Sequence, residues 1–236
     1  MVKSLDKYRR EFLGNVSHEL KTPVFNIQGY VQTLIDGGLN DKTINMKYLR
    51  RANKSIDRMI NIIQDLETIT SLESDITNLE FKRINLKKLV KEVFAHLELK
   101  AKEKSIHLSY LQNTDCRYVY ADRNKIFQVF VNLISNSIRY GKNGGKTKVV
   151  VQSDSKNMLV NVIDDGLGIK EKHLGRLFER FYRVDKNRSR EQGGTGLGLA
   201  IVKHIIEAHD SKIFVSSVHG EGSDFKFKLS LPFNCC

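Results

Sequence analysis

Residues 17–23 read Ser-His-Glu-Leu-Lys-Thr-Pro and lie inside a long helical pattern near the start of the chain. Apolar residues recur around this stretch in alternating steps of three and four, at Leu13, Val16, Leu20, Pro23, Ile27, Tyr30 and Leu34. A seam that repeats every seven residues is typical of a coiled coil or a helix bundle. With Leu13 at the first heptad position, His18 falls farthest from the seam, so we expect its imidazole to be accessible to solvent.

Thr22 and Pro23 follow His18 within about one helical turn. Thr22 lies four residues after His18, which places both on the same side of the predicted helix. Pro23 has no backbone N–H, so the carbonyl of Glu19 loses its helical partner and we expect a kink beside His18. An exposed histidine is most often an ordinary solvated side chain; the functional alternative is an acceptor of a group delivered by a second domain.

A turn and a second helix of the same kind follow. The segment Asp36-Gly37-Gly38-Leu39-Asn40-Asp41 has the composition of a turn. The second helix repeats the apolar spacing at Ala52, Ile56, Met59, Ile63 and Leu66. A lone hairpin has little with which to cover this seam, whereas two hairpins could bury it in a four-helix bundle. We therefore predict an all-α, dimeric domain over residues 1–75.

The pattern changes after Glu73-Ser74-Asp75. Helices are predicted over residues 86–103, 122–137 and 197–208, with Asp122 as the N-cap of the second. Short strands are predicted at residues 106–110, 117–121, 147–152, 158–163, 213–218 and 225–231. Strands and helices mixed in this order favour an α/β sandwich over residues 76–236, with helices over one face of a sheet.

Composition and charge restrict the class of protein. Apolar residues make up 40% and charged residues 28% of the chain, which excludes a collagenous or wholly disordered protein. No apolar run reaches the roughly 20 residues that span a bilayer. Almost all of the net charge of +12 falls after residue 75. A basic surface of this kind fits a solvated face, a polyanionic ligand such as a nucleotide, or an acidic protein partner. No zinc-finger spacing or RNA-binding aromatic signature supports nucleic acid as a ligand.

Two asparagines, Asn132 and Asn136, lie one turn apart on an otherwise apolar helix. Amide oxygens are hard ligands that suit Mg²⁺, an ion that keeps several waters and also uses substrate phosphates. The two residues are therefore candidate metal ligands. The alternative is a pair of amides whose hydrogen bonds are satisfied inside a helix–sheet interface.

Two glycine-rich stretches follow, Asp-Asp-Gly-Leu-Gly-Ile at residues 164–169 and Gly-Gly-Thr-Gly-Leu-Gly-Leu-Ala at residues 193–200. Glycine lets the backbone approach phosphates closely, and a helix that begins near Gly196 would offer them unpaired N–H groups. Neither stretch is a P-loop or a dinucleotide fingerprint. Between them, residues 177–183 read Leu-Phe-Glu-Arg-Phe-Tyr-Arg in a loose excursion of about 30 residues that we predict to be a lid.

In this order, the clusters resemble the cytoplasmic core of a bacterial sensor histidine kinase, over nearly the whole chain. The stretches that resemble its H box, N box, first glycine box, F box and second glycine box are residues 17–23, 132–140, 164–169, 177–183 and 193–200. The hairpin and loop pattern indicates a relation to phosphate-regulon sensors. The resemblance implies a dimeric four-helix bundle followed by an α/β sandwich of the histidine-kinase/Hsp90-like ATPase type.

The resemblance also implies roles for single residues. His18 would accept the γ-phosphoryl group of ATP, Glu19 would act as its base or orienting group, and Thr22 would assist dephosphorylation of the partner. Asn136 would ligate Mg²⁺ with support from Asn132, and Asp164 would accept the adenine amino group. The other residues implied in nucleotide binding are Arg139, Tyr140, Gly166, Gly168, Ile169, Arg183, Gly194, Thr195, Gly196, Leu197, Gly198 and Leu199.

The implied activity is autophosphorylation on His18 and transfer to an aspartate of a response-regulator receiver domain, with phosphatase activity on the phosphorylated regulator. The implied partners are a second copy of the chain and that receiver domain, with no nucleic acid. The implied location is the cytoplasmic side of an inner-membrane sensor, with membrane contact only through a missing N-terminal part. Two alternatives remain: a clamp-type ATPase of the gyrase and Hsp90 group, and a degenerate dimeric scaffold.

The sequence departs from the family pattern at three places. Arg139 stands where lysine is common, Asp210-Ser211 where glycines often follow the histidine, and Asp165 where asparagine is usual. Arg139 keeps its positive charge, so we expect little loss there. Asp165 adds a negative charge near the nucleotide, and ATP affinity is the property that it would lower.

Overall fold

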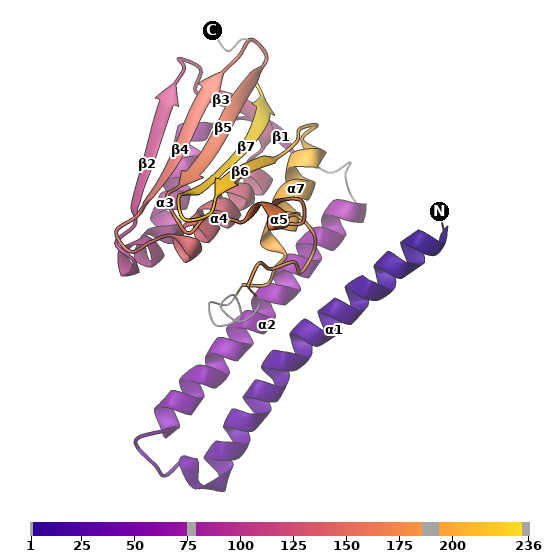
Figure 1. The fold of residues 1–236 in the computed structure, drawn as a ribbon, viewed down its shortest axis with the longest axis vertical. Helices are drawn as coiled ribbons and strands as arrows, with labels where there is room; N and C mark the ends of the chain where they lie inside the picture. The colour runs from indigo at the N-terminus through magenta and orange to yellow at the C-terminus, as the bar shows by residue number, and fades with distance from the viewer. Residues whose placement is uncertain (1, 75–78, 186–193, 233–236) are drawn as a thin grey trace. The chain divides into compact units, whose positions relative to one another are not determined.

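The computed structural model describes residues 2–74, 79–185 and 194–232. Within these ranges, no helix has both the length and the apolar content required to cross a bilayer. The helical and α/β parts expected from the sequence are both present (Figure 1).

Contacts divide the chain into two compact units. The first comprises Met1–Thr68 with Asp185–Leu197, and the second comprises Ile69–Val184 with Gly198–Cys236. The predicted domain boundary between residues 75 and 76 lies outside the described residues, since the last helix before it ends at Ser74. That boundary therefore stays a prediction.

The first unit is built on a helical hairpin of α1 (Val2–Thr33) and α2 (Asn45–Ser74), which run side by side (Figure 1). Between them, Leu34–Gly38 forms a wide π-type turn in which Gly37 adopts a φ of +115°, a conformation that favours glycine. The expected kink at Pro23 does not interrupt the helix, because α1 continues through this residue for ten more. One missing backbone hydrogen bond is tolerated where the turns on either side keep theirs.

The members of the predicted seam on α2 differ in exposure within the single chain. Ala52 and Ile62 are buried, whereas Ile56 and Ile63 are each 43% exposed. The exposed members are seam residues that the predicted second hairpin would cover, so the seam stays a prediction.

The second unit contains a five-stranded sheet in the order β2-β4-β5-β7-β6. Its strands, in that order, are His107–Asn113, Lys146–Ser153, Asn157–Asp164, Gly222–Ser230 and Phe214–Val218. β2 pairs with β4 in parallel, and the other neighbours are antiparallel. A separate two-stranded sheet pairs β1 (Phe81–Asn85) with β3 (Tyr118–Asp122).

Helices cover one face of the larger sheet. α3 (Leu86–Glu103) and α4 (Arg123–Tyr140) lie behind it in the view of Figure 1, and α7 (Gly198–Ala208) packs on α4. Inward-facing residues alternate along β4 and β5, as a half-covered sheet requires. The core includes Phe130 of α4 against Phe227 of β7, with ring centroids 5.9 Å apart. The predicted α/β sandwich is confirmed.

The start of α4 is fixed by Asp122, as the sequence predicts. Its carboxylate accepts the backbone N–H groups of Asn124 (2.9 Å) and Lys125 (3.0 Å), and also that of Glu80 (3.1 Å) at the start of β1. One N-cap therefore holds both the helix and the small sheet. β1 and the four-residue helix α5 (Glu171–Leu174) have no counterpart in the sequence prediction.

Candidate functional site

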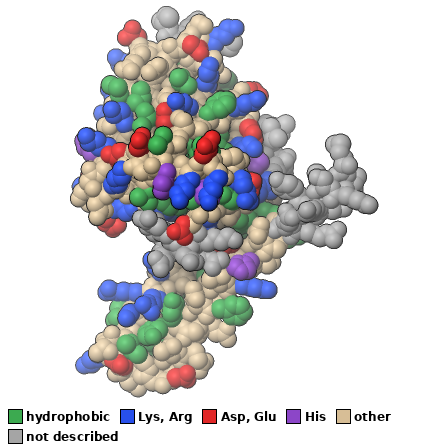
Figure 2. Space-filling view, viewed as in Figure 1, with side chains coloured by type: hydrophobic (Ala, Val, Ile, Leu, Met, Phe, Trp, Pro, Cys, Tyr) green, Lys and Arg blue, Asp and Glu red, His purple; other side chains and the backbone are tan. Residues whose placement is uncertain are grey.

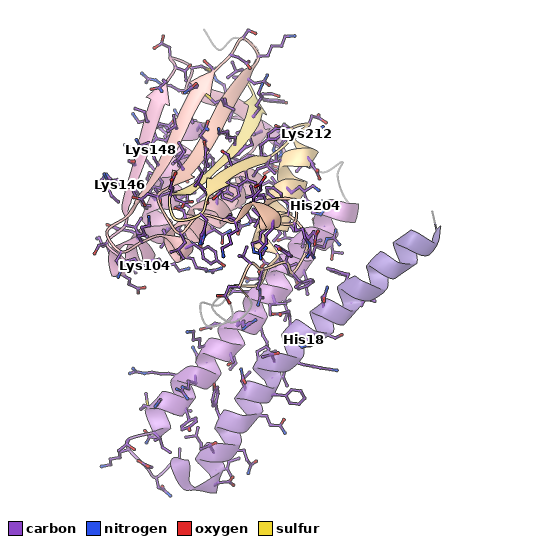
Figure 3. All side chains as sticks on the ribbon, in the orientation of Figure 1. His18, Lys104, Lys146, Lys148, His204 and Lys212 are labelled. Atoms are coloured by element: carbon purple, nitrogen blue, oxygen red, sulfur yellow. The ribbon has the colours of Figure 1, made fainter. Side chains whose placement is uncertain are left out.

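His18 lies on α1, partway along the hairpin, and its side chain is exposed (Figure 3). Among the described residues, its ring makes no hydrogen bond, so an incoming group meets no competing partner. One turn further on, the Thr22 hydroxyl donates to the backbone carbonyl of His18 at 3.2 Å. The structure therefore places Thr22 beside His18, with its hydroxyl engaged by the backbone.

Glu19 is directed away from solvent. Its Oε2 accepts from Nη2 of Arg58 on α2 at 2.7 Å, and each of the two side chains is 12% exposed. Reasoning from the sequence did not single out Arg58. The signal that could have found it is its position four residues before Ile62, which places a cation on the buried face of an amphipathic helix.

The two asparagines lie on α4, and both are half-buried. The Nδ2 of Asn132 is buried and has no hydrogen-bond partner within the described residues. Its Oδ1 faces the first residue of α7, because a Cβ added at Gly198 would lie 3.4 Å from it. The structure thus brings the predicted N box and the end of the second glycine stretch together in the second unit.

An orphaned amide N–H₂ group beside a glycine suits an anionic ligand. A buried donor without an acceptor carries a cost of about 1–3 kcal/mol, which a phosphate oxygen would remove. The first turn of α7 adds unpaired backbone N–H groups on the same side. Among the described residues, no three or more His, Cys, Asp or Glu side chains gather to hold a metal ion. Asn136 and Asn132 remain suitable for Mg²⁺, which needs few protein ligands when phosphates supply the others.

Asp164 ends β5, and its Oδ1 accepts the backbone N–H of Gly166 at 2.9 Å. Burial raises the pKa of Asp164 above its usual value, the hydrogen bond from Gly166 opposes this shift, and the charge of neighbouring Asp165 adds to it. The acid remains half-buried and can accept a hydrogen bond from a polar ligand. These are the properties expected of a residue that selects a base edge.

The first glycine stretch is packed against the end of α4. Leu167 donates its backbone N–H to the carbonyl of Tyr140 at 3.1 Å, and a Cβ at Gly166 would lie 2.8 Å from the same oxygen. Gly168, with a φ of +60°, passes so close to Val218 that an added Cβ would lie 1.9 Å from its carbonyl oxygen. Close packing of this kind, rather than flexibility, explains both glycines.

Three further predicted residues lie at the edges of this region: Arg139, Tyr140 and Ile169. Lys104 Nζ donates to the carbonyls of Ile138 and Arg139, at 3.0 and 2.5 Å, and so satisfies the C-terminal end of α4 that carries Arg139 and Tyr140. Figure 3 labels this lysine just beyond α3. Ile169 donates its N–H to Ser217 Oγ at 2.8 Å, which ties the glycine stretch to β6.

Asp165, the departure from the family pattern, has a local partner. Its Oδ1 accepts the backbone N–H of Lys146 at 2.8 Å, at the first residue of β4. An asparagine oxygen could accept the same bond, so the geometry does not require the extra charge. The expected effect of Asp165 on ATP affinity stays a prediction.

Side-chain contacts link residues within the described part of the segment that the sequence predicts to be a lid. Tyr182 hydrogen-bonds to His173 Nδ1 at 2.7 Å, and the Arg176 guanidinium lies over the Tyr182 ring at 4.5 Å from its centroid. Phe181 adopts a φ of +63°, which is uncommon for a bulky residue and reverses the chain here. Arg183, implied in phosphate contact, is half-buried in this turn.

The second glycine stretch spans both units. Gly194, Thr195, Gly196 and Leu197 belong to the first unit, where the Thr195 hydroxyl donates to Asp65 Oδ2 at 2.6 Å and accepts the N–H of Leu197 at 3.2 Å. Gly198 and Leu199 belong to the second and begin α7, one residue after the start of the predicted helix over residues 197–208. Gly196 has a φ of +79°. Residues 186–193, including Gly193, lie outside the described residues.

Two family models match the chain. Residues 8–75 match the His Kinase A (phospho-acceptor) domain. Residues 121–233 match the histidine kinase-, DNA gyrase B-, and HSP90-like ATPase family. The first match contains His18, and the second contains both asparagines, both glycine stretches and the lid. Together they cover most of the chain.

Whole proteins with both parts are also similar. Sensor histidine kinase WalK of Bacillus subtilis (strain 168) is 35% identical over 229 residues, which cover 95% of this chain and 37% of that protein. The chain therefore spans little more than a third of the length of this curated relative.

Two solved structures extend this similarity to the fold. Histidine kinase AdeS of Acinetobacter baumannii superposes with a TM-score of 0.75 at 28% identity, over 92% of this chain and 98% of that one. Histidine kinase ThkA, solved in complex with the response regulator protein TrrA, gives a TM-score of 0.76 at 25% identity, over 94% of this chain and 61% of that one.

Proposed function

We propose, from the premise that this chain belongs to the bacterial sensor histidine kinases and forms their catalytic core, that it phosphorylates itself on His18 with ATP. The observation that carries the proposal is the exposed imidazole of His18, in a chain that also holds an ATPase fold; within the described residues, neither this ring nor the buried Nδ2 of Asn132 has a hydrogen-bond partner. A clamp-type ATPase needs no such histidine, and a degenerate scaffold needs no such anion site.

In the proposed reaction, an imidazole nitrogen of His18 attacks the γ-phosphorus of ATP, and the bond to the β–γ bridging oxygen breaks to release ADP. Glu19 holds the proton on the other ring nitrogen. Asn132 and the start of α7 orient the phosphates, and Asp164 selects adenine. Mg²⁺, when bound at Asn136, supplies charge neutralisation at the phosphates. Positioning and electrostatics provide most of the rate enhancement in reactions of this type.

The phosphoryl group would then pass to an aspartate of a response-regulator receiver domain. This step is proposed from the family and from the histidine kinase ThkA, which was solved with its response regulator. The reverse activity, removal of phosphate from the regulator, would use the Thr22 hydroxyl to hold a water. Its bond to the His18 carbonyl would have to open for this role.

We also propose that the hairpin, residues 1–75, forms a homodimer, while residues 76–236 form the catalytic domain. Several large apolar side chains remain on the hairpin surface (Figure 2). On α2 these are Met46, Leu49, Ile56, Ile60 and Ile63. A second hairpin would bury them in a four-helix bundle. The same proposal places the chain on the cytoplasmic side of an inner-membrane sensor, where ATP and receiver domains are available.

The test is labelling of the protein with γ-³²P-ATP. His18→Gln should abolish incorporation of acid-labile, base-stable phosphate, while MgATP still binds with unchanged affinity by calorimetry. The matched control is His107→Gln, which removes another exposed histidine and should label like the wild type. Persistent labelling of His18→Gln would show that another residue accepts the phosphate. ADP release without any phosphoprotein in the wild type would favour a clamp-type ATPase.

A further inference from the structure

The Arg58–Glu19 pair is a polar contact that joins the two helices next to His18. The partners are 39 residues apart in sequence, their charged atoms are 2.7 Å apart, and both side chains are 12% exposed. A surface ion pair would contribute little, because solvent and side-chain entropy offset the attraction. A pair this well covered differs from a surface pair, because removing one of two charges that are largely shielded from solvent is costly.

Position on the helices explains why these two side chains meet. Arg58 lies four residues before Ile62, and Glu19 four residues before Pro23; Ile62 and Pro23 are both buried. Residues four apart share a helix face, so Arg58 and Glu19 both point into the hairpin. His18 is one residue earlier, about 100° around the helix, and is exposed.

Glu19 is therefore the fixed member of the His18–Glu19 pair. A glutamate side chain has several rotatable bonds, and a group that holds a proton must be kept within hydrogen-bond reach of it. The planar guanidinium of Arg58 restricts where the carboxylate can lie. The His18 ring has no hydrogen bond to any residue that the structure describes, so it can rotate toward the carboxylate.

We propose that Arg58 is a positioning residue for autophosphorylation, which holds the Glu19 carboxylate in place so that it can orient the His18 imidazole. This inference rests on the proposed function. It adds no covalent step: Arg58 keeps its protons, Glu19 accepts a hydrogen bond from the ring N–H of His18, and the other ring nitrogen remains the nucleophile. Arg58 acts only through Glu19.

The experiment measures autophosphorylation rate against ATP concentration. Arg58→Gln should lower kcat by about 10-fold with an unchanged KM for ATP, because the nucleotide site is untouched. Arg58→Lys, which restores the charge but not the planar guanidinium, should recover part of this loss and leave kcat about 3-fold below the wild type. In a Glu19→Gln background, Arg58→Gln should have no further effect. Arg50→Gln removes an exposed arginine from the same helix and should match the wild type.

Each outcome decides the inference. A wild-type kcat for Arg58→Gln, or the same fractional loss with and without the Glu19 carboxylate, would overturn it. If Arg58→Gln fails to fold by circular dichroism, Arg58→Lys gives the answer: a roughly 3-fold loss of kcat that disappears in the Glu19→Gln background supports the role, and an equal loss in both backgrounds refutes it. If the wild type incorporates no acid-labile phosphate, the proposed function has failed rather than the role of Arg58.

Discussion

The hairpin and the α/β unit differ in how far they bury their large apolar side chains. The α/β unit covers one face of its sheet with helices and buries large side chains such as Phe130 and Phe227. The hairpin leaves large apolar side chains at its surface, including Phe25 and Ile60, and encloses an ion pair between its helices. One region completes its own core, and the other leaves an apolar surface for a partner.

This difference indicates how the chemistry is divided. A nucleotide site needs rigid walls, and the second unit supplies them through close glycine packing and an N-cap that holds two elements. An acceptor histidine must be reached by more than one protein, and a slender hairpin leaves it exposed on a long surface. Substitutions in the hairpin should therefore leave nucleotide binding intact, and substitutions at the nucleotide site should leave the hairpin surface intact.

The largest effect is expected at the apolar surface of the hairpin. Ile63→Asp would place a charge where the proposed dimer buries a side chain that is 43% exposed in the single chain, and should weaken the dimer by about 100-fold. Light scattering over a dilution series measures this, and MgATP affinity should not change. Asn61→Asp, which adds the same charge at a neighbouring exposed position, should remain dimeric. A dimeric Ile63→Asp protein would contradict the proposed interface.

The converse change lies in the second unit. Asn136→Ala should weaken Mg²⁺-dependent ATP binding by about 10-fold, because an oxygen ligand is lost from a site with few protein ligands. Calorimetry with and without Mg²⁺ separates the contribution of the metal ion to ATP affinity from that of adenine recognition. The variant should remain dimeric. Asn143→Ala, an exposed asparagine in the loop after α4, serves as the control. Unchanged MgATP affinity for Asn136→Ala would exclude it as a ligand.

A smaller effect is expected from pH at the core of the second unit. His209 is buried, accepts the N–H of Asp122 through Nε2 at 3.0 Å, and pairs with the Ile205 carbonyl through Nδ1 at 2.7 Å. Burial lowers the pKa of His209 below 6.5, although the Ile205 carbonyl and nearby acids oppose this shift. The folded state thus favours the neutral ring. Its contribution to the free energy of unfolding is present above about pH 6.5 and is lost as the pH falls toward the lowered pKa.

Urea unfolding at pH 7.5 and 5.5 tests this expectation. His209→Gln should lower the free energy of unfolding by ~1 kcal/mol at pH 7.5. Between pH 7.5 and pH 5.5, the free energy of unfolding should then fall by less in this variant than in the wild type. His107→Gln, at an exposed position, should leave the pH dependence as in the wild type. If both variants retain the full pH dependence, another group is responsible.

The smallest effect belongs to Thr22, where the hairpin would act without ATP chemistry. Thr22→Ala should slow the loss of phosphate from a purified phosphorylated regulator by about 3-fold, since the hydroxyl would position a water rather than transfer a proton. Thr22→Ser keeps the hydroxyl and should behave as the wild type. Equal decay with Thr22→Ala and wild type would leave the hydroxyl with only its bond to the His18 carbonyl.

Local signals predicted most of the second unit. The helix over residues 86–103 has the predicted bounds, and the Asp122 cap appears in the predicted place. β1 was missed because its five residues include two exposed cations, Lys82 and Arg83, and it exists only through pairing with β3. Such pairing depends on the tertiary fold and leaves no periodic signal.

The candidate site shows the same limit. The exposure of His18 follows from its heptad position, which is local. Arg58 could not be found in this way, because its partner lies on another helix and the register between helices is set by packing. The burial of single residues on α2 shows the same limit: Ile62 and Ile63 are neighbours in sequence, yet one is fully buried and the other is 43% exposed.

The pairing of β5 with β7 has a consequence for how this kind of chain can evolve. The two strands pair antiparallel from Asn157↔Ser230 to Asp164↔Ser223. Residues 165–221 therefore form one long excursion that leaves the sheet at the end of β5 and returns at the start of β7. The entropy of closing such a loop grows only logarithmically, and doubling its length costs only about 0.6 kcal/mol. Extra residues between the helices and strands of this excursion would thus add little to the cost of folding, whereas α7 and β6 within it are fixed by packing and pairing. Natural selection can therefore vary the length of the predicted lid segment while β5 and β7 stay in register.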